Sequence, residues 1–95
     1  MKFVNKFPVV LNAMVNSVYL QTIEAPFGTR LVSVTEEADC VYVNGIVDQR
    51  ETNMSRLKIW CVSTNNGIVP DGPRVRFIGS VPDGKFIYHL FTEDL

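Results

Sequence analysis

The only histidine of the chain, His89, is the side chain best suited to proton chemistry, because imidazole titrates near neutral pH. Catalysis would need a second group, and the sequence contains no nucleophile elbow, phosphate-binding glycine loop or metal-ligand spacing. We therefore predict that the protein is not an enzyme and that Tyr88 and His89 contact a ligand or a partner. A structural histidine with satisfied hydrogen bonds is the competing interpretation, and catalysis by His89 is the least favoured.

Two arginines, Arg74 and Arg76, alternate with apolar residues at the start of a strand-like segment. With this spacing both cations project from one face of a strand. A guanidinium group clamps phosphate, and a ring such as Trp60 stacks on a base, so these residues predict an anion- or nucleotide-binding surface. Solvent-facing arginines, and a Trp60 that belongs to the core or to an interface, are the alternatives.

The polar residues Thr64, Asn65 and Asn66 precede Gly67 in the longest stretch without strand character after the N-terminal third. The asparagines most simply form a turn, but their side chains can also bind a polar ligand. If this loop folds over the following strands, all candidate ligand-binding residues converge on one site. These residues are Trp60, Thr64, Asn65, Asn66, Arg74, Arg76, Tyr88 and His89.

Neither the acidic residues nor the cysteines form a recognisable metal motif. Glu36, Glu37 and Asp39 lie in an expected connection, and we interpret them as solvated surface because a metal site there would need further ligands. Cys40 and Cys61 lack the close spacing of zinc and redox motifs, and we predict that both are buried and reduced. We expect no metal ion and no cofactor.

Short strand-like runs separated by turn residues must position these groups. The clearest pair is a hairpin of 75–81 and 85–91, with turn chemistry at Pro82-Asp83-Gly84. The segment 2–11 suits an edge strand because Pro8 removes a ladder donor, and 12–19 is interpreted as a loop or an irregular turn. Together the strand-like segments predict an all-β, mainly antiparallel sandwich or barrel-like sheet of six or seven short strands with little helix. The remaining expected strands are 20–24, 30–35, 40–47 and 56–62.

The size and composition of the chain fit one soluble domain spanning residues 1–95. A net charge of −1 disfavours duplex DNA as a partner, because nonspecific nucleic-acid binders carry a basic surface. No apolar run reaches the roughly 20 residues of a membrane-spanning helix, and polar residues interrupt any secretory signal at the N-terminus. We expect a cytoplasmic protein that does not interact with membranes.

Three segments carry a resemblance to a known family. They are Gln21–Gly28 with Leu31–Val34, then Phe77-Ile78-Gly79-Ser80, and finally Phe86–Phe91. They resemble the signatures of a family of short, uncharacterised domains of tailed phages and bacterial prophages, whose members end in Phe-Val-Trp-His-Val-Phe. That family usually has a Gly-Thr-Gly-His turn after the strand that holds Trp60, whereas this chain has Ser63-Thr64-Asn65-Asn66. The missing turn histidine argues against carrying over any activity.

The resemblance implies a small phage-encoded accessory protein of the host bacterial cytoplasm. The leading hypothesis is that the protein binds and sequesters a nucleotide-derived host immune signal. One alternative is a protein–protein inhibitor of a host defence complex such as a CRISPR effector, and another is a structural or virion-associated phage protein. The expected partner is therefore a small nucleotide-like ligand or a host defence protein, and the edge strand and aromatic residues are compatible with a homodimer.

Overall fold

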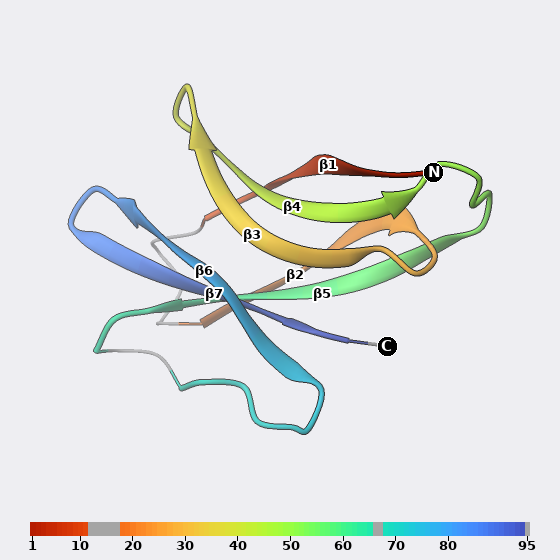
Figure 1. Ribbon diagram of the computed structural model, residues 1–95. Helices are drawn as coiled ribbons and strands as arrows, with labels where there is room; N and C mark the ends of the chain where they lie inside the picture. The colour runs from red at the N-terminus through yellow and green to blue at the C-terminus, as the bar shows by residue number, and fades with distance from the viewer. Residues whose placement is uncertain (12–17, 66–67, 95) are drawn as a thin grey trace.

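Two antiparallel sheets form the described part of the chain, which covers residues 1–11, 18–65 and 68–94 of the computed structural model. One sheet has the strand order β1-β4-β3 and the other β2-β5-β7-β6, and they lie face to face (Figure 1). The all-β prediction is confirmed, and the architecture is the sandwich. None of the described residues forms a helix that could span a membrane. The strands are β1 Lys2–Val9, β2 Val18–Pro26, β3 Arg30–Glu37, β4 Cys40–Asp48, β5 Met54–Ser63, β6 Val75–Asp83 and β7 Phe86–Glu93.

The core lies between the sheets and follows the alternation of side chains along each strand. In β4 every second residue from Val41 to Val47 is buried, and in β7 Tyr88, Leu90 and Thr92 are buried while their neighbours are not. Because successive side chains point to opposite faces of a strand, the intervening residues of β7 face away from the core. We call the side of the four-stranded sheet that points away from β1, β4 and β3 the outer face.

The predicted C-terminal hairpin is present, but its turn lies further along the chain than Pro82-Asp83-Gly84. Asp83 pairs with Phe86, so the two turn residues are Gly84 and Lys85, and Gly84 has a φ of 60°. A glycine at the first position of a two-residue turn matches the twist of the flanking strands. The shift occurs because Pro82 still fits an edge strand, where its missing N–H need not be bonded.

A β-bulge in β6 brings the two sheets together at one side of the sandwich. The register of β6 against β7 shifts between Phe77 and Gly79, and β6 is in contact with β3. An added Cβ at Gly79 would lie 2.9 Å from Cγ2 of Val34, closer than real Cβ contacts. Glycine is therefore required here by the close approach of β3.

The other side of the sandwich is joined through β1, which pairs only with β4 and is the edge strand expected from Pro8. The Gln21 amide on β2 accepts a hydrogen bond from Val10 N at 3.0 Å and donates one to Val10 O at 2.6 Å. This side chain replaces the ladder bonds that the end of β1 lacks. The interpretation of 12–19 as a loop falls mostly outside the described residues, although Val18 and Tyr19 belong to β2.

The cysteine prediction is right for one residue and wrong for the other. Cys61 is buried, 1% exposed, in the middle of β5. Cys40 is exposed, because it is the first residue of β4 and directly follows the tight turn formed by Ala38 and Asp39, which both have positive φ. Position in the strand, which the apolar neighbours of Cys40 do not reveal, decides its exposure.

Candidate functional site

A row of apolar side chains crosses all four strands on the outer face. The strand registers place Leu20 opposite Trp60, Trp60 opposite Phe91, and Phe91 opposite Phe77. The Phe77 and Phe91 rings meet edge to face with centroids 5.5 Å apart. Leu20 and Phe77 are about half exposed, so the row is a surface feature and not part of the core.

His89 lies beside this row and is held from both sides. Its Nδ1 is 2.6 Å from the Ser80 hydroxyl of β6, and its Nε2 is 2.7 Å from the Thr64 hydroxyl that follows β5. The Thr64 hydroxyl also donates to Ile87 O at 3.3 Å, so it accepts from the Nε2–H of His89, and Nδ1 then accepts from the Ser80 hydroxyl. This geometry matches the interpretation of His89 as a structural histidine, because both ring nitrogens have a hydrogen-bond partner.

The structure brings only some of the predicted site residues together. Trp60, Thr64 and His89 share the outer face, and Asn65 directly follows Thr64 with a φ of 71°. Tyr88 is 4% exposed and points into the core, so it does not form a common surface with His89. Adjacent strand residues point to opposite faces, which separates the pair. Asn66 lies outside the described residues.

The two predicted arginines do not join this surface. Arg76 pairs in register with Thr92, which is buried, whereas the neighbouring Phe77 pairs with Phe91 on the outer face. The guanidinium of Arg76 therefore points away from Trp60 and binds both carboxylate oxygens of Asp94, each at 3.0 Å. The backbone carbonyl of Arg74 accepts a hydrogen bond from the Asp94 amide at 2.9 Å. The predicted convergence of all eight residues on one site is not what the structure shows.

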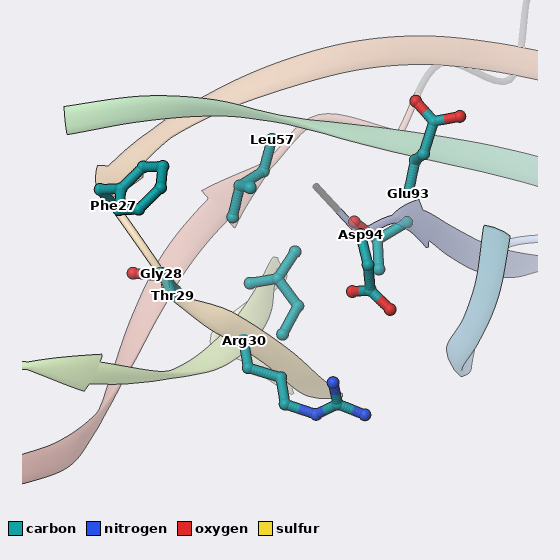
Figure 2. Close-up of a pocket in the computed structure, with 9 residues that line it drawn as sticks. Phe27, Gly28, Thr29, Arg30, Leu57, Glu93 and Asp94 are labelled. Atoms are coloured by element: carbon teal, nitrogen blue, oxygen red, sulfur yellow. The ribbon is translucent and has the colours of Figure 1, made fainter. Parts of the chain in front are cut away.

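Asp94, the partner of Arg76, lines a pocket of about 380 Å³ at one end of the sandwich, which we call the Arg30 pocket. Figure 2 shows Phe27 and Gly28 at one side, Glu93 and Asp94 at the other, and Leu57 and Arg30 between them. Its elements are the turn between β2 and β3, the start of β3, and the end of β7. The pocket is lined by Phe27, Gly28, Thr29, Arg30, Leu31, Leu57, Thr92, Glu93 and Asp94.

Charge at the rim of the Arg30 pocket is organised around Asp94. The bidentate hydrogen bonds from Arg76, with a further contribution from the Arg30 charge, lower the pKa of Asp94 below its usual value. Glu93 is paired with Lys58 at 3.7 Å. Among the described residues, Arg30 takes part in no salt bridge. Its exposed guanidinium is therefore the cation at this rim that is available to an anion.

Two hydroxyl groups line the pocket, and both are engaged. Thr29 Oγ1 donates to Pro26 O at 2.6 Å, and Thr92 Oγ1 donates to Lys58 O at 2.9 Å. Neither is positioned beside an imidazole or another base that could activate it. Within the described residues no group of three or more His, Cys, Asp or Glu side chains is arranged to hold a metal ion.

Sequence reasoning missed the main residues of this pocket. Phe27, Arg30 and Asp94 belong to segments far apart in the chain, which meet at the end of the sandwich where the two sheets pack together. No local sequence motif predicts the contact between these segments. The one signal in the sequence was a cation, Arg30, at the first position of the strand that follows the Pro26-Phe27-Gly28-Thr29 turn.

A family model described as "Domain of unknown function (DUF7352)" matches residues 1–95. No curated protein and no solved structure matches the chain.

Proposed function

Because the chain belongs to this family of domains of unknown function, we propose a function from its own geometry: it binds a small nucleotide-like anion without turning it over. The Arg30 pocket is the proposed site. Its volume of about 380 Å³ lies in the range of small-molecule sites, roughly 300–1,000 Å³. The single observation that carries the proposal is a free guanidinium at the mouth of a concave, largely apolar pocket.

Each part of such a ligand has a complement in the pocket. A phosphate group accepts two parallel hydrogen bonds from a guanidinium, which Arg30 can supply. The Phe27 side chain at the rim is 58% exposed and offers a ring on which a base can stack. Leu31 and Leu57 give the floor an apolar surface, and both are buried. Arg76 neutralises Asp94, which reduces the repulsion that this carboxylate would exert on an anion.

The absence of an activated nucleophile among the described lining residues supports binding over catalysis. Both lining hydroxyls already donate to backbone carbonyls, and His89 lies on the outer face with both ring nitrogens engaged. A domain that holds a nucleotide without converting it removes that nucleotide from solution. In a phage-encoded protein of the host cytoplasm, the sequestered molecule is a nucleotide-derived immune signal, as the resemblance implies.

Isothermal titration calorimetry against a panel of nucleoside monophosphates, cyclic nucleotides and ADP-ribose derivatives tests this function. We expect at least one compound to bind, and the Arg30→Ala variant to bind it at least tenfold more weakly. Arg50→Ala is the matched control, because Arg50 is 81% exposed by its side chain and does not line the pocket. Absence of heat with every compound would overturn the proposal, as would equal losses in the two variants.

A pull-down from host lysate separates sequestration of a small molecule from inhibition of a defence complex. The proposed function predicts that no protein is retained in stoichiometric amount. A retained complex whose capture is insensitive to Arg30→Ala would favour the inhibitor alternative instead.

A further inference from the structure

Exposed apolar side chains gather on the outer side of the four-stranded sheet, away from the Arg30 pocket. Leu20, Phe77 and Ile87 project from β2, β6 and β7, and each is about half exposed. The half-buried Trp60 and Phe91 lie between Leu20 and Phe77 in the same cross-strand row. Contiguous apolar surface of this kind marks an interaction site on a small domain.

The connection from β5 to β6 adds to this surface. These two strands run parallel with β7 between them, so the chain passes from one side of β7 to the other between Ser63 and Val75. In Figure 1 the described residues 68–74 of this connection lie on the side of the sheet opposite β1, β4 and β3. Within the loop Ile68 is 83% exposed and Val69 is 54% exposed. Ile68 and Val69 therefore add two exposed apolar side chains to this side of the molecule.

The charges of the outer face favour a partner with the same charge pattern. Lys58 pairs with Glu93 at 3.7 Å, and Arg56 lies 3.9 Å from Glu24. This balance gives no net positive surface for nucleic acid or for an anionic membrane. The outer face does carry positive and negative side chains next to each other. A two-fold interface needs this arrangement, because each cation of one copy must face an anion on the identical surface of the other copy.

We infer that the outer face is the interface of a two-fold homodimer. A rotation axis parallel to the strands, between β5 and β7, brings the β2–β5 half of one copy over the β7–β6 half of the other. Lys58 then lies over Glu93 of the second copy, and Leu20 lies in the row of Phe77 of the second copy. Ile68 and Val69 of each copy then face the β2–β5 half of the other.

The outer face offers most of the area that such a dimer needs. Four strands about 4.8 Å apart and roughly nine residues long, at about 3.3 Å per residue, outline a face of roughly 600 Å². The exposed side chains of Ile68 and Val69 add to this projected area. Stable interfaces bury about 800 Å² per partner, so nearly the whole outer face must take part.

Sedimentation velocity over a range of concentrations tests the dimer directly. The wild-type chain is expected to reach twice its mass of 10.7 kDa, and Ile68→Asp and Leu20→Asp are expected to sediment as monomers. Ile68 is too exposed to be needed for folding, so loss of the dimer in that variant reports the interface. Val4→Asp is the control, because Val4 is 66% exposed on β1 of the other sheet.

A charge exchange gives an independent test of the orientation. Lys58→Glu alone is expected to weaken the dimer, and the Lys58→Glu/Glu93→Lys double variant to restore it. A wild-type protein that stays monomeric at all concentrations would overturn the inference, and so would a dimer that survives Ile68→Asp. If Val4→Asp dissociates the dimer as strongly as Leu20→Asp does, the interface does not lie on the outer face, and the inference is overturned.

Discussion

The close approach of β6 to β3 makes Gly79→Ala the sharpest test of how the two sheets are joined. The new Cβ would lie 2.9 Å from Cγ2, 3.0 Å from Cβ and 3.3 Å from the backbone nitrogen of Val34. Ordinary contacts begin near 3.4 Å, so the side chain and the backbone of Val34 must both move. Overpacking of this kind costs about 1–3 kcal/mol. For a domain of this size, about 2 kcal/mol corresponds to a decrease in Tm of roughly 8–16 °C.

Chemical and thermal unfolding of five variants separates the clash from backbone effects: Gly79→Ala, Gly84→Ala and Val34→Ala, and the two double variants that combine each glycine substitution with Val34→Ala. Val34→Ala removes the nearest of the three contacts, so in the double variant it should recover part of the stability that Gly79→Ala loses. Gly84→Ala is the control, because Gly84 also has a positive φ but has no atom within 4 Å of the Cβ that alanine would add. Its cost should not depend on residue 34. A Gly79→Ala variant within about 0.5 kcal/mol of wild type, or a double variant without recovery, would refute the reasoning.

Three further predictions concern other parts of the sandwich. Burial raises the pKa of the Cys61 thiol to about 11, so a thiol reagent at pH 8 should modify Cys40 quickly and leave Cys61 unreacted until the protein unfolds. Since Arg76 holds the pKa of Asp94 below its unfolded value, this pair stabilises the fold above that unfolded pKa, and its contribution is lost as pH falls through the folded pKa. Arg76→Ala should therefore reduce the difference in urea midpoint between pH 7 and pH 3; an unchanged difference would contradict this. Gln21→Ala should cost about 1–3 kcal/mol in urea unfolding, because it removes both hydrogen bonds that join the end of β1 to β2, and no loss would disprove that role.

The alternation of side chains was enough to predict the fold class, because each strand alternates between the core and solvent or lies in an apolar run. The same alternation places Tyr88 and His89 on opposite faces of β7. The predicted site wrongly put both residues on one surface. Arg76 could not be placed from sequence, because its partner Asp94 lies beyond the hairpin and its direction depends on a β-bulge. Arg30 comes near that pair because its strand belongs to the opposite sheet, which packs against the end of β7. Long-range contacts thus decided the site, whereas local pattern decided the strands.

The pairing order of the strands has a consequence for biosynthesis. β1 pairs with β4 and β2 pairs with β5, so neither N-terminal strand can find its neighbour until much of the chain has been translated. At about 5–20 residues per second, the 45 residues between Val18 and Ser63 take roughly 2–9 s to synthesise. During that interval the edges of β1 and β2 are unpaired and open to nonspecific pairing. Nascent chains of this protein are therefore expected to need chaperone protection until β5 leaves the ribosome.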